Sequence, residues 1–235
     1  MKQILKSARV EKSIAPTEMD MLLINKQTLR TLDAGEVFVF KLAACGEQVD
    51  RDHERFTAGA LKQMAEKFVG LPVLQDHKWS AAAQTARVYA AKVEGEGGNK
   101  TLVLRCYMPR TDSTADMISA IESGILRECS VGLAVGKVLC SICGANQRET
   151  ICRHIGGREY DGKSCWFDLD EVTDAYEISF VAVPAQPGAG VTKSKRYGEE
   201  VPPVPNPAEA GDDDVFLLAR AMQEQEEMRY GGFEK

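Results

Sequence analysis

Histidine and long apolar runs are scarce in this sequence. The 235 residues include three histidines, His53, His77 and His154. No segment approaches the roughly 20 apolar residues that a membrane-spanning helix requires. The first nine residues carry charges with no apolar stretch behind them, which is unlike a secretory signal. We therefore expect a cytosolic protein without a membrane partner, whose seven cysteines are reduced and better suited to metal binding or catalysis than to disulfides.

An excess of basic residues is also missing. Residues 197–235 contain ten acidic and three basic residues, whereas the 196 residues before them contain 25 acidic and 26 basic ones. A nearly neutral main part gives no electrostatic reason to expect nucleic-acid binding. Residues 201–207 hold four prolines, which indicates a stiff linker. Three aspartates at 212–214 suit the start of a helix, so we expect residues 197–235 to form a Pro-rich linker and an acidic helical tail.

The hydrophobic pattern predicts a mixture of helices and strands. The 44% hydrophobic and 27% charged content is typical of a globular protein with a buried core. The expected fold is α+β, built on a curled sheet or barrel, with residues 46–56 as a polar loop. Helices are predicted over 17–33, 57–68 and 112–122, and strands over 36–43, 72–74, 86–93, 101–108, 128–138 and 175–183.

One strand combines an apolar face with a face of small side chains. A strand places alternate residues on opposite faces, and a face of small side chains lets a packed helix or a substrate approach the backbone. Ser130 lies on the small face and is a candidate nucleophile. Cys129 is a rival nucleophile, but it points to the apolar side and is expected to be a core thiol. The apolar face holds Cys129, Val131, Leu133 and Val135, and the small face holds Ser130, Gly132, Ala134 and Gly136.

His77 is the best candidate for a base. It follows the apolar segment LPVLQD, so it lies at the end of a predicted strand, where a rigid scaffold can orient it. The alternative is a surface histidine near Trp79. His53 is flanked by charged residues and is expected to be solvated.

Glu177 is an acid within an otherwise apolar predicted strand. Burying a carboxylate without a partner is costly. A histidine would be one suitable partner, because a third group commonly orients the base of a Ser–His hydrolase. An arginine such as Arg87 or Arg127 would be another.

Three segments, in this order, resemble one known family. They are DHKW (76–79), ECSVG (128–132) and YEISFVAVPAQPGAG (176–190). Their combination resembles the prohead, or capsid-maturation, protease family of tailed bacteriophages, which is related in fold to the herpesvirus assemblin proteases. The resemblance covers roughly residues 20–193.

The resemblance implies a fold, an activity and partners. The fold would be a partly open, mostly antiparallel β-barrel surrounded by helices, with a protease domain over residues 1–196. The activity would be that of a serine endopeptidase that cleaves the major capsid protein and the scaffold protein inside the assembling prohead, in the host cytoplasm. A homodimer or higher homo-oligomer is implied as well.

The resemblance also assigns the site residues. Ser130 would be the nucleophile, His77 the general base and Glu177 the third member. The herpesvirus branch uses a second histidine as third member, and His154 follows Ser130 by 24 residues. We favour Glu177, because His154 lies among cysteines.

Those cysteines belong to a predicted insertion at residues 139–166. Cys140, Cys143, Cys152 and His154 have the spacing C-x2-C-x8-C-x-H, which can supply four tetrahedral ligands to a structural zinc ion. Cys165 could replace His154 as the fourth ligand. Metal binding would explain how such a polar segment folds. The alternatives are free thiols or a disulfide.

A rival hypothesis assigns no catalysis to the chain. It would then be a non-enzymatic capsid assembly or scaffolding protein that uses the zinc module and the acidic tail. The two hypotheses differ over Ser130 and His77, because a scaffold has no reason to hold these two residues together.

Overall fold

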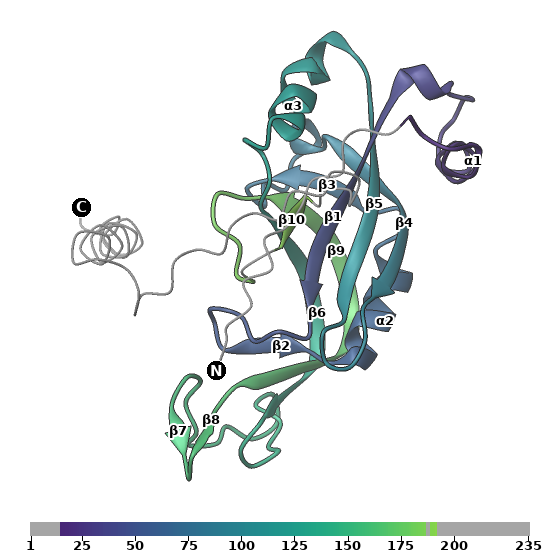
Figure 1. Cartoon of the computed structure of the whole chain (residues 1–235). Helices are drawn as coiled ribbons and strands as arrows, with labels where there is room; N and C mark the ends of the chain where they lie inside the picture. Colours follow the sequence, from purple (N-terminus) through teal and green to yellow (C-terminus); the bar gives the residue numbers. More distant parts are fainter. Residues whose placement is uncertain (1–14, 187–188, 192–235) are drawn as a thin grey trace, which may run out of the picture. The chain divides into compact units, whose positions relative to one another are not determined.

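The computed structural model describes residues 15–186 and 189–191 (Figure 1). Within these residues, eight strands form one sheet and two short strands form a hairpin. The sheet strands are β1 (Val37–Gly46), β2 (Glu54–Phe56), β3 (Pro72–Gln75), β4 (Ala86–Glu94), β5 (Thr101–Pro109), β6 (Cys129–Cys140), β9 (Phe167–Phe180) and β10 (Gly190–Val191). The hairpin strands are β7 (Glu159–Tyr160) and β8 (Lys163–Ser164), and the helices are α1 (Glu18–Asn25), α2 (Ala58–Lys67) and α3 (Asp112–Glu122).

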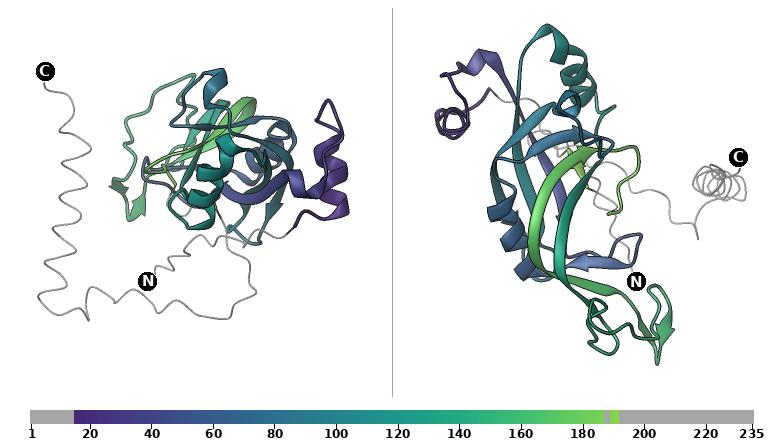
Figure 2. Two further views of the ribbon diagram at one scale, coloured as in Figure 1. Left: turned by 90° about the horizontal axis from the view of Figure 1, so that it is seen from above. Right: turned by 180° about the vertical axis from the view of Figure 1, so that it is seen from behind.

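The sheet curls around an apolar core, as two further views show (Figure 2). Its strand order is β10-β1-β5-β4-β3-β9-β2, and β6 pairs with β9 off this path. This arrangement confirms the α+β prediction with a curled, half-barrel sheet. The strands predicted over 36–43, 86–93 and 101–108 are present as β1, β4 and β5, and one face of each contributes apolar residues to this core.

Helix α2 closes the core on one side. It begins after Thr57, whose hydroxyl accepts a hydrogen bond from the Ala60 N–H, and Gly70 adopts a left-handed φ of 91° just beyond its end. The predicted helical spacing is confirmed, because the residues at that spacing are fully buried against the sheet. They are Leu61, Met64 and Phe68, with Ala60 beside them.

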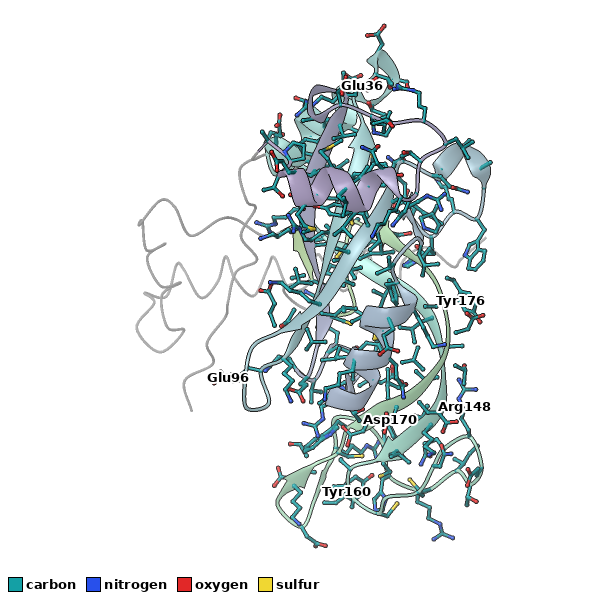
Figure 3. All side chains as sticks on the ribbon, turned by 90° about the vertical axis from the view of Figure 1, so that its right-hand side faces the viewer. Glu36, Glu96, Arg148, Tyr160, Asp170 and Tyr176 are labelled. Carbon is teal, nitrogen blue, oxygen red and sulfur yellow. The ribbon has the colours of Figure 1, made fainter. Side chains whose placement is uncertain are left out.

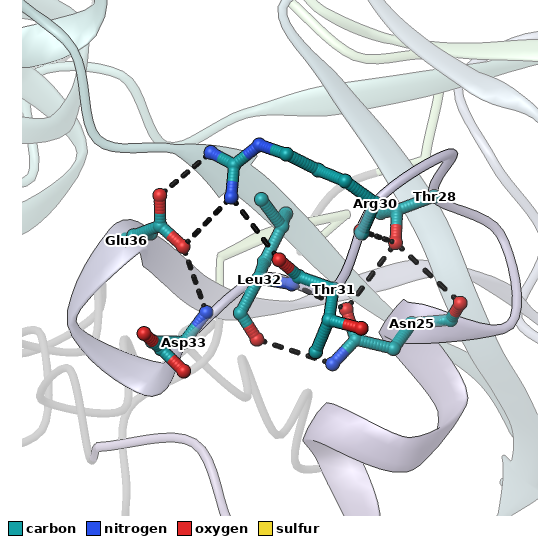
Figure 4. Close-up of polar contacts among 7 residues, drawn as sticks. All are labelled: Asn25, Thr28, Arg30, Thr31, Leu32, Asp33 and Glu36. Atoms are coloured by element: carbon teal, nitrogen blue, oxygen red, sulfur yellow. Dashed lines mark hydrogen bonds and ion pairs between the residues drawn. The ribbon is translucent and has the colours of Figure 1, made fainter.

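Helix α1 is shorter than the predicted span of 17–33. Thr17 and Asp20 form a capping box at its start, but the helix ends at Asn25. The reason is the Asn25 side chain, which accepts a hydrogen bond from the Leu32 N–H at 2.8 Å and donates one to the Leu32 carbonyl at 3.1 Å. These bonds turn residues 26–32 into a loop (Figure 4).

The same loop carries a surface ion pair. The Arg30 guanidinium donates to both carboxylate oxygens of Glu36, at 3.1 and 2.6 Å, and the Asp33 N–H donates to Glu36 Oε2 at 2.8 Å (Figure 4). The hydrogen bonds from Arg30, followed by the one from Asp33, lower the pKa of Glu36 to about 2. Because both side chains are exposed, the pair fixes the shape of the loop and adds little stability.

Strand β9 is the longest of the sheet and begins earlier than predicted. It starts at Phe167, eight residues before the predicted Ala175, and pairs with β6 over its whole length. Its first residues also pair in parallel with β2, which lies in the segment predicted to be a loop. That prediction is wrong at Glu54–Phe56, because three residues without apolar alternation give no strand signal and take their form from the neighbouring strand.

The predictions for the C-terminal tail concern residues outside the described ranges. The Pro-rich linker and the acidic helix lie within residues 192–235, so they and the domain boundary at residue 196 stay predictions. Among the described residues, no helix is long and apolar enough to cross a membrane.

A buried acid attaches α1 to the outer face of the sheet. Asp20 is 2% exposed, and it accepts a hydrogen bond from the Tyr89 hydroxyl at 3.0 Å and pairs with Arg105 at 2.6 Å. Burial would raise the pKa of Asp20, but the hydrogen bonds from Thr17 and Tyr89 and the charge of Arg105 outweigh it and lower that pKa.

This pKa shift predicts a pH-dependent stability. Because the pKa of Asp20 is lower in the folded chain, its contribution is present above the unfolded pKa of about 3.9 and is lost as pH falls through the folded value. Asp20→Asn should lower the free energy of unfolding at pH 7 by about 2 kcal/mol and flatten its decline between pH 5 and 2. Urea unfolding measures both effects, with the exposed Glu96→Gln as control. Parallel curves for Asp20→Asn and the natural chain would contradict the prediction.

Candidate active site

The two faces of β6 are as the alternation predicts. Cys129 is fully buried and lies opposite Phe180 of β9, on the core side. Ser130 is half-buried and lies opposite Ser179 on the other face. Directly opposed residues of an antiparallel pair have their side chains on the same face, with Cβ atoms about 5 Å apart. Ser130 is therefore displayed away from the core.

His77 reaches this face through a turn at the end of β3. Strand β3 runs parallel to β9, and the Asp76 N–H continues the pairing with a hydrogen bond to the Phe180 carbonyl at 2.9 Å. Asp76 and His77 then take left-handed φ values of 53° and 52°. Such values are uncommon outside glycine and cluster at functional sites. The turn brings the imidazole back over β9.

The imidazole meets Glu177. His77 Nδ1 lies 2.7 Å from Glu177 Oε1, and Glu177 is 1% exposed while the His77 side chain is 41% exposed. The arginine alternatives are excluded, because Arg87 bonds to the Gly70 carbonyl and Gln84, and Arg127 pairs with Glu128. Glu177 therefore has a histidine partner that offsets the free-energy cost of burying its carboxylate.

A β-bulge turns Glu177 outward. Gly132 pairs with Glu177, but the next β6 residue, Leu133, pairs with Ala175, which leaves Tyr176 as an extra residue. Ala175 and Ile178 both point into the core. The two residues between them, Tyr176 and Glu177, therefore lie toward the outer face.

The small face of β6 accommodates acids of β9. A Cβ added at Gly132 would overlap Glu177 Oε1, and one at Gly136 would lie 3.0 Å from the Glu171 carboxyl carbon. From the sequence, either a packed helix or a substrate could explain why the side chains on this face are small. At Gly132 the reason is instead the carboxylate of the neighbouring strand.

Ser130, His77 and Glu177 thus share one surface of three adjacent strands. Glu177 holds Nδ1 of His77, so Nε2 is the ring nitrogen that could act as a base. Within the described residues, no hydrogen bond joins His77 to Ser130. Catalytic hydrogen bonds often tighten only when substrate is bound.

Cys129 lacks the environment of a reactive thiol. Its side chain is fully buried and donates to the Ala43 carbonyl at 3.6 Å. Burial, with the nearby Glu128 charge, raises the pKa of Cys129. Since the thiolate is the nucleophilic form, Cys129 acts as a core thiol.

Ser179 is a site residue that the sequence interpretation missed. Its hydroxyl donates to Glu177 Oε2 at 2.5 Å and accepts the His77 backbone N–H at 3.1 Å. The sequence contains the signal that could have identified it. Residues two apart in a strand share a face, and Ser179 follows Glu177 by two residues.

Two exposed aromatic rings border the site. Trp79, two residues after His77, is 72% exposed, and Tyr176, next to Glu177, is 37% exposed. Their ring centroids are 5.6 Å apart. Tyr176 is visible at the surface of the molecule in Figure 3.

The predicted metal ligands also come together. One donor atom from each of Cys140, Cys143, Cys152 and His154 lies within 4.8 Å of the others, so this Cys3His cluster could hold a metal ion such as zinc. His154 Nδ1 is 3.6 Å from the Cys140 sulfur. Burial would raise the pKa of Cys140, but hydrogen bonds from the N–H groups of Cys143 and Ile142 lower it, which favours the thiolate that metals require.

Cys165, the alternative fourth ligand, is 1% exposed and lies outside this set of four. It nevertheless interacts with Cys140, since burial and the neighbouring Cys140 thiol together raise the pKa of Cys165. A set made of Cys140, Cys143, Cys152 and His154 agrees best with the distances.

The Cys-His cluster and the histidine–glutamate pair lie at opposite ends of β6. Cys140 ends this strand and Ser130 is its second residue, so about 30 Å of strand separates them. Figure 3 shows Tyr160, whose ring contacts His154, near one end of the molecule and Tyr176 well away from it. His154 therefore cannot serve as a third member beside His77.

The overlap at Gly132 generates a testable prediction. Gly132→Ala should displace the Glu177 carboxylate, break its contact with His77 and lower the free energy of unfolding by about 2 kcal/mol. Gly136→Ala is the matched control, because it meets only the exposed Glu171 side chain, which can move. Urea unfolding measures stability, and ¹⁵N NMR of the three histidine rings reports the contact. Equal behaviour of the two variants would contradict the prediction.

Comparisons with known proteins leave the function to be argued from this geometry. No protein-family model, curated protein or solved structure matches the chain.

Proposed function

We propose that this protein is a serine endopeptidase with Ser130 as nucleophile, His77 as general base and Glu177 as the residue that orients His77. The observation that carries the proposal is the 2.7 Å contact between a half-exposed imidazole and a buried carboxylate, on the face from which Ser130 projects. The left-handed turn at His77 adds support, since backbone strain of this kind is typical of functional sites.

The reaction would follow the steps of a serine hydrolase. His77 Nε2 takes the proton of Ser130 while the oxygen attacks the scissile carbonyl, and Glu177 stabilises the imidazolium that forms. His77 then gives this proton to the leaving amine. Water, deprotonated by His77, hydrolyses the acyl-enzyme and regenerates Ser130.

The surroundings of the site favour a peptide substrate. Trp79 and Tyr176 present an exposed apolar surface beside His77 and Glu177, where a substrate side chain can be buried. The sequence resemblance to prohead proteases supplies the more specific proposal. The substrates would be a scaffold protein and a major capsid protein in an assembling phage head, processed by a herpesvirus-protease-like fold that forms a homodimer or higher oligomer.

Coexpression tests this proposal. The natural chain, produced together with the proposed capsid and scaffold substrates, should give shortened forms of both, and Ser130→Ala should leave them intact because it removes the attacking oxygen. Cys129→Ala is the control for the neighbouring thiol and should cleave normally. Identical uncleaved bands with the natural chain and Ser130→Ala would refute the peptidase assignment and favour the non-enzymatic scaffold.

We further propose that the Cys3His cluster binds a structural zinc ion. Three thiolates and one imidazole form a donor set typical of closed structural zinc sites. Protein ligands would fill all four positions, so the metal would hold the insertion together and take no part in peptide cleavage. Residues 141–158 contain no regular strand or helix, which agrees with a segment that depends on a metal for its shape.

Metal analysis tests the zinc proposal. Protein purified under reducing conditions should contain one zinc ion per chain, and Cys143→Ser should lose it and lower the melting temperature by about 10 °C. Cys143 is exposed, so this change removes a ligand without opening a cavity. Cys45→Ala, outside the cluster, should keep the zinc. Natural protein without bound zinc would exclude the proposal.

A further inference from the structure

A second serine occupies the centre of the candidate site. Ser179 is fully buried and lies between His77 and Glu177, where no substrate carbonyl can reach it. None of the reaction steps above uses it. We propose that Ser179 is a positioning residue that sets both the place and the tautomer of His77, an inference that rests on the proposed serine peptidase function.

Three contacts join Ser179, Glu177 and His77 in a closed ring. The His77 backbone N–H donates to Ser179 Oγ at 3.1 Å, Ser179 Oγ donates to Glu177 Oε2, and Glu177 Oε1 lies 2.7 Å from His77 Nδ1. His77 is therefore attached to β9 at two points, through its backbone and through its ring. A ring of this kind fixes the imidazole more tightly than the carboxylate alone would.

The backbone contact matters because the turn is strained. Asp76 and His77 both have left-handed φ values, which are sterically unfavourable for residues other than glycine. In this turn, the Asp76 N–H is held by the Phe180 carbonyl and the His77 N–H by Ser179. Without the Ser179 hydroxyl, the His77 N–H has no acceptor to hold the turn closed.

The same hydroxyl holds in place the carboxylate that selects the tautomer. A hydroxyl has one hydrogen, and Ser179 gives it to Glu177 Oε2 while its oxygen accepts the His77 N–H. This bond keeps Oε1 of Glu177 turned toward the ring. Because a carboxylate oxygen only accepts, His77 carries its proton on Nδ1 as long as Oε1 stays there, which leaves Nε2 free to act on Ser130. Without the Ser179 hydroxyl the carboxylate can turn away, and the ring is then free to take either tautomer.

The geometry of the sheet places Ser179 where it can do this. Ser179 lies opposite Leu74 of β3 on one side and opposite Ser130 of β6 on the other. It therefore lies in the strand row that links the element carrying the base to the element carrying the nucleophile. A shift of His77 relative to Ser179 is also a shift relative to Ser130.

The test compares Ser179→Ala with Thr85→Ala in the full chain. Thr85 is a suitable control, because its hydroxyl also bonds to β3, at the Val73 carbonyl, but does not contact the site. With a peptide copied from a mapped capsid cleavage site, Ser179→Ala should lower kcat by about 10- to 100-fold and leave KM within about twofold. Thr85→Ala should change neither value by more than about twofold.

A second measurement is independent of proteolysis. Long-range ¹H–¹⁵N NMR of the three histidine rings, with His77 assigned through His77→Gln, distinguishes the two neutral tautomers. The natural chain and Thr85→Ala should show the Nδ1–H form of His77, and Ser179→Ala a mixture. Ser179→Cys fills the same space with a thiol, which is a weak donor and a weak acceptor, so it should behave like Ser179→Ala. If Ser179→Ala does not fold, Ser179→Cys takes its place in both measurements.

The outcomes separate this inference from the proposed function. Natural kcat and an unchanged His77 tautomer in Ser179→Ala or Ser179→Cys would overturn the positioning role while leaving the peptidase intact. If the natural chain cleaves nothing, the peptidase proposal fails, and the NMR result alone decides whether Ser179 orients His77. Equal loss of kcat in Thr85→Ala would also overturn the inference, because it would show a general effect on β3.

Discussion

The burial of the Glu177 carboxylate is the constraint on which the rest of the site depends. An ionised group at 1% exposure needs a partner for each oxygen, and here His77 and Ser179 supply one each. The same carboxylate requires the absence of a side chain at Gly132, across the strand pair. One buried charge thus accounts for residue choices on three strands and for the turn that returns His77 to the sheet.

The sheet also explains why the candidate active site and the Cys-His cluster are far apart. Strands β6 and β9 are paired from Ser130 to Cys140, so one two-stranded ribbon carries the candidate active site near one end and the Cys-His cluster at the other. Only the part of the ribbon near Ser130 is flanked by β3, which pairs with β9 at Ile178–Phe180, so rigid packing can orient side chains there. The far part extends from the sheet (Figure 1), and its insertion has few buried residues of its own. The Cys3His cluster could hold a metal ion that orders this insertion.

Much of the fold and part of the site could be predicted from local patterns. Alternation identified the faces of β6, and the cost of an unpartnered acid pointed from Glu177 to a histidine. The bulge at Tyr176, the short strand β2 and the left-handed turn at Asp76–His77 could not be predicted. Each arises from how neighbouring strands align, and no periodicity within a single strand records that alignment. Ser179 could have been found, because its spacing from Glu177 places both on one face.

The glycines of β6 show how far such a pattern can be interpreted. A face of Ser, Gly, Ala and Gly indicates that something approaches the backbone closely, and the pattern alone allows a helix, a substrate or a neighbouring side chain. The structure assigns the space above Gly132 to Glu177, which makes the glycine part of the support for His77. Ser130 lies two residues before this glycine on the same face and remains half-exposed. A small-residue row beside a buried acid therefore indicates a supported histidine as readily as it indicates a substrate groove.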